Sequence, residues 1–166
     1  TEDRKRYGLN LIEDVKRNIT LSSLKSFVSF GLVNGNEEFK KASEYRESMN
    51  IKAPSVLSVV GQLSGGNQQK VVLSKWINVN PEILILDEPT RGIDVGAKGE
   101  IFDLLRERAE QGLAVLFVTS EISEALNWSD RIVVMSRGHI SGIYKPSGVS
   151  IALAAFAERP NCCPGS

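Results

Sequence analysis

The hydrophobic pattern of the chain alternates between stretches with helical spacing and short continuous apolar runs. Apolar residues recur at helical spacing over residues 95–110 and 66–77, and more weakly over residues 9–19. Another such stretch begins at Asn36, which we expect to be its N-cap because acidic residues follow directly. A short helix is also expected over residues 122–128. The pattern therefore predicts a chain rich in amphipathic helices.

Continuous apolar runs of strand length separate some of these helices. Residues 83–87 form one such run after Pro81, and we expect a strand buried on both faces, as in parallel sheets. Residues 113–119 form another, and residues 131–135 and 139–144 read as two strands joined by a turn. The order strand, helix, strand, helix, strand is typical of an α/β fold.

The pattern also suggests how the chain is organised. We predict an α/β domain over residues 1–144, with a mainly parallel sheet, flanking helices and a helical subdomain over about residues 10–78. Residues 145–166 are interpreted as a tail with one alanine-rich helix before an unstructured end.

Composition narrows the class of protein. The 166 residues are 42% hydrophobic and 24% charged, as in an ordinary globular domain, and 20 Lys and Arg balance 20 Asp and Glu. With no net positive charge, composition gives no indication of a nucleic-acid partner. The adjacent Cys162 and Cys163 have neither disulfide-framework nor metal-ligand spacing, which favours a reducing setting. No apolar run is long enough to span a bilayer.

A glycine-rich segment, Leu63-Ser-Gly-Gly-Asn-Gln-Gln-Lys70, stands at the start of a predicted helix. Gly65 and Gly66 let backbone N–H groups approach an anion, and the Ser64 hydroxyl can bond to it. A lone Ser-Gly-Gly is more often a simple helix cap, but its placement before Leu86-Asp-Glu-Pro-Thr90 favours phosphate binding.

Two carboxylates, Asp87 and Glu88, follow the predicted strand over residues 83–87. The carboxyl ends of strands in open α/β sheets are where ligands bind. Because strand side chains alternate in direction, the two carboxylates can divide their work. Asp87 can hold Mg²⁺ while Glu88 polarises an attacking water. A solvated strand end is the simpler alternative.

Three motifs in one order give a specific resemblance. The segments LSGGNQQK, ILILDEPT and RGIDVGA resemble the signature motif, Walker B strand and D-loop of the ATP-binding domains of ABC transporters. The segments EDRKRYGL and DEPTRGIDVGAK are similar to the second half of the fused ATPases of bacterial ribose, galactose and xylose importers. The resemblance covers about residues 2–140 and implies a partial P-loop NTPase-type fold.

The resemblance also implies roles for individual residues. Asp87 would bind Mg²⁺, Glu88 would be the catalytic base, and Asp94 would link the two ATP-binding halves. The residues expected to contact an ATP held by the other half are Ser64, Gly65, Gly66 and Gln68. The implied partners are the other ATP-binding half, transmembrane permease subunits and, indirectly, a periplasmic sugar-binding protein. The implied location is the cytoplasmic face of the membrane.

Departures from the family pattern limit these roles. The glycine-rich Walker A loop is absent from the 166 residues and would precede Thr1, so we interpret the chain as a fragment that is inactive alone. Glu2 stands where family members usually have glutamine. Ser120 stands where they usually have a histidine that touches the γ-phosphate, and it either lies near nucleotide or caps the following helix. A serine cannot carry positive charge, so the resemblance implies a degenerate site around Asp87 and Glu88.

Two other functions remain open. One is a non-catalytic half that supplies only its signature motif to a partner site. The other is an ABC-type DNA-maintenance ATPase, which is disfavoured because the chain has no heptad run for a long coiled coil. A domain without its first strands should also expose apolar surface, so we expect the isolated chain to aggregate or to pair with itself.

Overall fold

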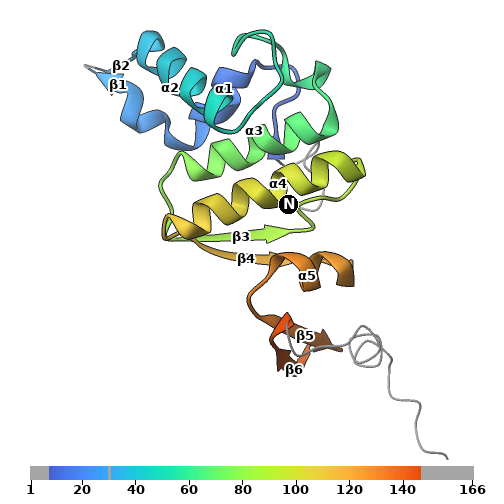
Figure 1. Cartoon of the computed structure of the whole chain (residues 1–166). Coiled ribbons are helices and arrows are strands. Elements are labelled where there is room, and N and C mark those ends of the chain that lie inside the picture. Colours follow the sequence, from blue (N-terminus) through green and yellow to red (C-terminus); the bar gives the residue numbers. More distant parts are fainter. Residues whose placement is uncertain (1–7, 30, 147–166) are drawn as a thin grey trace, which may run out of the picture. The chain divides into compact units, whose positions relative to one another are not determined.

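The computed structural model describes residues 8–29 and 31–146, which form two compact units divided between Val118 and Thr119 (Figure 1). The first unit contains α1 (Val15–Thr20), η2 (Leu21–Phe27), β1 (Val28–Ser29), β2 (Leu32–Val33), α2 (Gly35–Ser48), η3 (Val60–Gln62), α3 (Gly65–Ile77), β3 (Ile83–Asp87), α4 (Val95–Glu110) and β4 (Ala114–Val118). The second unit contains α5 (Ile122–Trp128), β5 (Ile132–Ser136) and β6 (His139–Tyr144). The predicted tail lies outside the described residues from residue 147 onward.

The helical part of the first unit is built around α1. This short helix packs against both α2 and α3, and its apolar residues Val15 and Ile19 are fully buried. Val71 and Leu73 of α3 are fully buried as well. Burial of each such side chain contributes about 1.5–3 kcal/mol, so α1 is held by packing rather than by its own helix propensity.

The cap of α2 differs from the prediction. Asn34, not Asn36, is the N-cap, and its Oδ1 accepts hydrogen bonds from the backbone N–H groups of Asn36 at 3.1 Å and Glu37 at 3.3 Å. Both asparagines are acceptable caps, and the short β1–β2 hairpin ahead of α2, which the sequence did not predict, ends the extended backbone one residue before Asn34.

β3 and β4 form a parallel pair with α4 as the crossover between them. Their register aligns Ile83 with Ala114 and Asp87 with Val118. Leu84 and Leu86 are buried on one face, where Phe117 meets Phe102 of α4 edge to face at 5.3 Å between ring centroids. Figure 1 shows α4 beside α3, over this pair of strands. The helix boundaries of α4 match the prediction, and the arrangement confirms the α/β class.

The other face of the β3–β4 pair contradicts the prediction of a strand buried on both faces. Ile83 and Ile85 are 63% and 68% exposed, and Leu116 and Val118 of β4 are each 54% exposed. The side chains of β3 therefore alternate between buried and exposed, because the described residues place a helix against only one face. The continuous apolar run leaves an apolar surface on the second face.

The second unit contains the predicted hairpin. β5 and β6 pair antiparallel around Arg137 and Gly138, which have φ angles of 48° and 79°. Both residues in the left-handed region match a type I′ turn, which suits the right-handed twist of the strands. Of the three two-stranded ladders among the described residues, only β3–β4 is parallel, so the mainly parallel sheet of the prediction is represented by this pair.

Candidate functional site

A cavity of about 290 Å³ lies where the start of α3 meets the start of α4, and we call it the signature cavity. It brings together Ser64 and Gly66 of the glycine-rich segment and Asp94, which follows the Asp87-Glu88 pair in sequence. The residues that line it are Lys52, Ser64, Gly66, Asn67, Lys70, Asp94, Gly96, Ala97 and Glu100. The segments that resemble the signature motif and the D-loop therefore line the same cavity.

Gly66 is required by the close approach of the two helices. A Cβ atom at this position would lie 2.8 Å from the Cβ of Ala97 on α4, closer than real Cβ contacts. The glycine therefore lets α3 and α4 approach until their first turns line one cavity. The close packing of the two helices, rather than a special backbone angle, explains the glycine.

The first turn of α3 presents hydrogen-bond donors. Ser64 is the N-cap, but its side chain accepts no bond from the N–H groups of the helix. Gln68 N–H donates to the carbonyl oxygen of Ser64 at 2.9 Å, so the N–H groups of Gly65 and Gly66 precede the first hydrogen bond of the helix. Free N–H groups at a helix start favour an anion by about 0.3–1 kcal/mol when exposed and by up to about 2 kcal/mol when partly buried.

Gln68 lies beneath this turn and does not line the cavity. Its side chain is buried, and its Nε2 donates to the carbonyl oxygens of Leu63 at 3.1 Å and Val60 at 3.3 Å. Gln68, which the sequence predicted to contact the nucleotide, therefore holds the segment that leads into Ser64.

Asp94 is the N-cap of α4. Its Oδ1 accepts a hydrogen bond from the N–H of Ala97 at 2.9 Å, which satisfies one of the free donors of the first turn. The carboxylate is exposed at the edge of the signature cavity. Asp94 thus has a local structural role in addition to the predicted link between halves.

A buried lysine at the base of the cavity was missed by the sequence analysis. Lys70 Nζ is 2.6 Å from a carboxylate oxygen of Glu100 and donates to the carbonyl oxygen of Asn50 at 3.0 Å. Its side chain is 2% exposed. The hydrogen bond from Lys70 lowers the pKa of Glu100 below its ordinary value. Lys70 ends the signature segment, but only its contacts reveal that it ties α3 to α4 and to the segment that follows α2.

Asp87 and Glu88 lie at the end of β3. Asp87 is exposed on the uncovered face of the strand pair. Glu88 adopts a φ of 46°, and its N–H donates to the carbonyl oxygen of Val118 at 2.9 Å. A glutamate in the left-handed region is uncommon, and such strained residues cluster at functional sites. The turn therefore directs the two neighbouring carboxylates differently.

Ser120 belongs to the second unit, where it is exposed just before α5. The N-cap of α5 is Glu121 and not Ser120, so the capping alternative for Ser120 is wrong. Thr119 takes part in the turn instead, since its Oγ1 accepts from the N–H of Glu121 at 3.1 Å and lies 2.7 Å from Glu124 Oε2.

The donor set at the strand end suits one kind of metal ion. Within residues 8–29 and 31–146 no group of three or more His, Cys, Asp or Glu residues could enclose a metal. Mg²⁺ in nucleotide sites takes one or two carboxylates and fills its remaining positions with phosphates and water. The exposed Asp87 fits an ion of that kind, held mainly by a nucleotide.

Similarity to known proteins identifies the family. The sequence profile of the ABC transporter family matches residues 4–91, which is more than half of the chain. The chain belongs to the ABC transporter family. None of the described helices is both long and apolar enough to cross a membrane.

Several relatives are ATP-binding proteins of sugar importers. The chain is 54% identical over 142 residues to the L-arabinose transport ATP-binding protein AraG of Geobacillus stearothermophilus, covering 86% of this chain and 28% of that protein. It is 51% identical over 145 residues to the xylose import ATP-binding protein XylG of Geobacillus kaustophilus, covering 87% and 29%. It is 50% identical over 143 residues to the ribose import ATP-binding protein RbsA of Lactococcus lactis, covering 86% and 29%. The chain thus spans less than a third of the length of these relatives.

Solved structures support the fold. The dimeric structure of a post-hydrolysis state of the ATP-binding cassette MJ0796 bound to ADP and Pi superposes with a TM-score of 0.71 at 27% identity. The superposition covers 87% of this chain and 62% of that cassette. The expected P-loop NTPase-type fold is confirmed.

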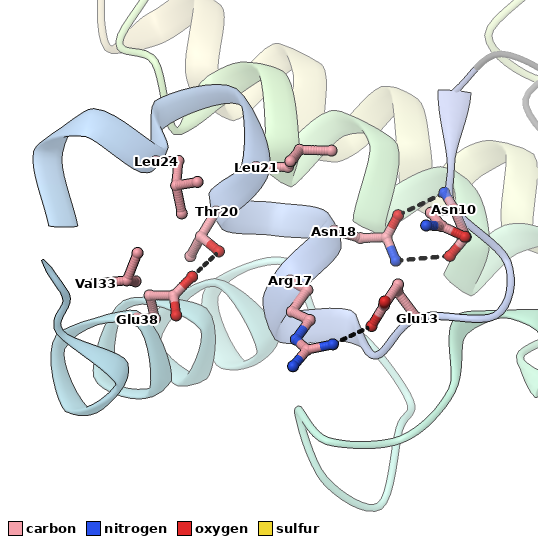
Figure 2. Close-up of a pocket in the computed structure, with 9 residues that line it drawn as sticks. All are labelled: Asn10, Glu13, Arg17, Asn18, Thr20, Leu21, Leu24, Val33 and Glu38. Carbon is pink, nitrogen blue, oxygen red and sulfur yellow. Dashed lines mark hydrogen bonds and ion pairs between the residues drawn. The ribbon is translucent and has the colours of Figure 1, made fainter. Parts of the chain in front are cut away.

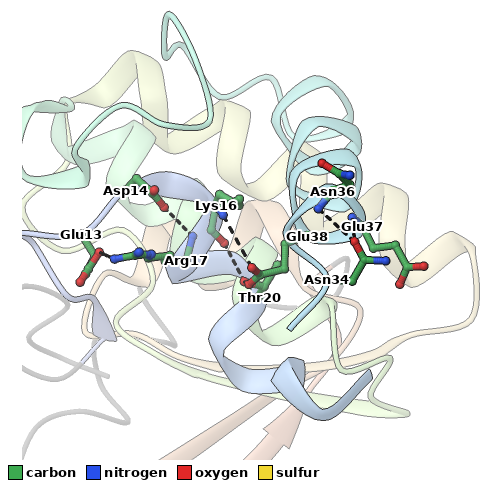
Figure 3. A network of polar contacts seen from close by, with 9 residues as sticks. All are labelled: Glu13, Asp14, Lys16, Arg17, Thr20, Asn34, Asn36, Glu37 and Glu38. Carbon is green, nitrogen blue, oxygen red and sulfur yellow. Dashed lines mark hydrogen bonds and ion pairs between the residues drawn. The ribbon is translucent and has the colours of Figure 1, made fainter. Parts of the chain in front are cut away.

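The ABC domain contains a second cavity, of about 370 Å³, between α1, η2, β2 and α2, which we call the helical cavity. Figure 2 shows the residues that line it: Asn10, Glu13, Arg17, Asn18, Thr20, Leu21, Leu24, Val33 and Glu38. The buried Glu38 receives a hydrogen bond from the Thr20 hydroxyl at 2.7 Å and lies 3.6 Å from Lys16 Nζ (Figure 3). Arg17 donates to Glu13 at 2.7 Å. These polar groups bond to one another within the cavity wall.

Proposed function

We propose that this chain forms part of the ATP-binding component of a bacterial carbohydrate importer, in which MgATP binding and hydrolysis drive uptake of a pentose or hexose. The relatives named for arabinose, xylose and ribose support the substrate class. The single observation that carries the proposal is the signature cavity, where the donors at the start of α3 and the capped start of α4 line one space.

In this proposal the signature cavity closes on a nucleotide bound by the other ATP-binding half. Ser64 and the N–H groups of Gly65 and Gly66 contact its phosphates, while Gln68 supports the loop from beneath. Asp94, which lines the same cavity, would lie at the border between the two halves. The donors of one helix start are too weak to hold a nucleotide alone, so the other half has to supply most of the affinity.

A second nucleotide site would form around the end of β3. There Asp87 would hold Mg²⁺, which would neutralise phosphate charge, and Glu88 would act as general base toward water. In sequence, Ser120 stands where the family usually has a histidine, and a serine cannot stabilise developing charge as an imidazolium can. The resemblance therefore favours slow or no hydrolysis by this half. That serine favours the second candidate function, a non-catalytic half that contributes its signature cavity to the competent site.

The proposed partners follow from the same function. They are the other ATP-binding half, transmembrane permease subunits on whose cytoplasmic side the protein would lie, and indirectly a periplasmic sugar-binding protein. ATP shifts the equilibrium between open and closed halves because it binds the closed arrangement more tightly.

The test is ATPase activity of the full-length protein that contains this chain, assembled with its permease in proteoliposomes. We expect S64A to lower the rate about tenfold or more, since a hydrogen bond to a charged group is worth about 1.5–3 kcal/mol. E88Q lowers the rate about a hundredfold or more if this copy catalyses, and leaves it unchanged if the chain is a non-catalytic half. The control is D103N, an exposed side chain on α4. An unchanged rate in both S64A and E88Q would overturn the proposed function.

A further inference from the structure

Asn67 lies between a backbone donor and the signature serine. Its Oδ1 accepts the N–H of Lys52 at 2.7 Å, and its Nδ2 is 2.8 Å from Ser64 Oγ. Lys52 belongs to the segment that follows α2, whereas Ser64 and Asn67 belong to the start of α3. The side chain of Asn67 therefore connects two segments of the cavity wall.

The chemistry of Lys52 fixes the direction of both hydrogen bonds. A backbone N–H can only donate, so the oxygen of the Asn67 amide has to face Lys52. The NH₂ group of the amide then faces Ser64, and the serine oxygen is the acceptor in that contact. The single proton of the Ser64 hydroxyl is consequently not used by Asn67.

The position of Ser64 leaves that proton available to a ligand. The serine is exposed on the wall of the signature cavity, and its side chain does not cap α3. The neighbouring N–H groups of Gly65 and Gly66 are donors as well. The hydroxyl of Ser64 and these two N–H groups are donors that suit an anionic oxygen, as a phosphate group presents.

The segment that supplies the donating N–H of Lys52 is held in place by the buried ammonium group of Lys70. Lys70 bonds to the carbonyl oxygen of Asn50, two residues before Lys52, and to Glu100 on α4. The ammonium group of Lys52 itself lies 3.9 Å from Glu100. The segment that orients Asn67 is thus tied to both helices of the cavity.

We propose that Asn67 is a positioning residue that turns the Ser64 hydroxyl proton toward the phosphate of a bound nucleotide. In this chain of hydrogen bonds, Lys52 N–H donates to Asn67 Oδ1 and the Asn67 NH₂ group donates to Ser64 Oγ. The Ser64 hydroxyl then donates to the ligand. Hydrogen bonds in such a chain polarise one another, which strengthens the last donor. This inference rests on the proposed function of the signature cavity.

A double-mutant cycle separates this role from simple support of the loop. The KM for MgATP and kcat are measured for the full-length protein in proteoliposomes, as S64A, N67A and the double variant. We expect N67A to raise KM about three- to tenfold, and S64A about tenfold or more, because both weaken a bond to a charged acceptor. In the S64A background N67A should change KM by less than about twofold, since Asn67 acts through Ser64. The matched control is N36A, an exposed asparagine of α2.

The outcomes distinguish a failure of the positioning role of Asn67 from a failure of the proposed nucleotide contact. If N67A costs as much with S64A as without it, Asn67 supports the loop independently of the serine and the positioning role is wrong. If N67A alone has no effect while S64A does, the positioning role is also wrong, and the proposed function stands. If S64A itself has no effect, the proposed nucleotide contact fails.

Discussion

The two cavities of the first unit differ in whether their polar groups bond to one another or remain available to a ligand. In the helical cavity, carboxylates, hydroxyls and cations from α1 and α2 satisfy one another, as Thr20 and Lys16 do for Glu38. In the signature cavity, the Asn67 amide is satisfied by Lys52, and the donors of Ser64 and the first turn of α3 remain directed at the space. We therefore assign the nucleotide contact to the signature cavity and not to the larger helical cavity. Unsatisfied donors, rather than volume, distinguish a binding surface from a packing defect.

The largest effect should follow from filling the glycine contact of the signature cavity. In G66A the new methyl group would lie 2.8 Å from the Cβ of Ala97, so α3 and α4 have to separate. We expect a loss of about 1–3 kcal/mol of unfolding free energy, as for overpacked cores. We also expect ATPase activity of the full-length protein to fall about tenfold or more, because Ser64 moves with α3. Urea unfolding and ATPase rates check this, and unchanged values in both would show that the helices yield without cost.

A smaller effect should follow from removing the carboxylate beside Lys70. E100Q leaves the ammonium group of a 2% exposed lysine with the Asn50 carbonyl and a neutral amide. We expect a loss of about 1–2 kcal/mol, less than for a fully buried pair because Glu100 is itself 43% exposed and screened by water. The control is E44Q in the exposed Lys41–Glu44 pair, where we expect about 0.5 kcal/mol or less. Equal losses in the two variants would contradict a special role of Lys70.

The same pair predicts a pH dependence. Lys70 lowers the pKa of Glu100 in the folded chain, so the stabilisation is fully present above the ordinary glutamate pKa of about 4.3. It is lost as the pH falls through the lowered pKa of the folded state. Urea unfolding between neutral and acidic pH should therefore show a steeper loss of stability in the unmodified chain than in E100Q.

The helical cavity should respond in stability alone. T20V keeps the shape of Thr20 but removes the hydroxyl that donates to the buried Glu38. We expect a loss of about 1 kcal/mol of unfolding free energy, the usual net value of one internal hydrogen bond. The KM of the full-length protein for MgATP should stay within about twofold of its original value, since this network is satisfied internally. A tenfold increase in KM without loss of stability would instead connect the helical cavity to nucleotide binding.

The sequence predicted the helices and strands better than it predicted which segments pack against them. The boundaries of α4 and β6 follow from periodicity and from turn residues such as Gly138. The motifs singled out Ser64, Gly66 and Asp94 as candidates, and the structure shows that they line one cavity. The burial of Gln68 and the Lys70–Glu100 pair could not be predicted, because each depends on which segment packs against α3. The exposed face of β3 likewise depends on what covers the sheet, which its apolar sequence does not specify.

The smallest effect on stability is expected at a glycine outside the cavities, and its sign is opposite to that of the other variants. Gly99 lies inside α4, and a Cβ at this position would meet no atom within 4 Å. G99A should therefore stabilise the fold by about 0.5–1 kcal/mol, because alanine has the higher helix propensity and restricts the unfolded chain. Urea unfolding measures this gain, and ATPase activity should not change. The opposite signs of G99A and G66A would attribute the cost at Gly66 to the closeness of α3 and α4, since both variants make the same chemical change in a helix. A destabilised G99A would show that α4 does not accept a side chain at this position and would remove that distinction.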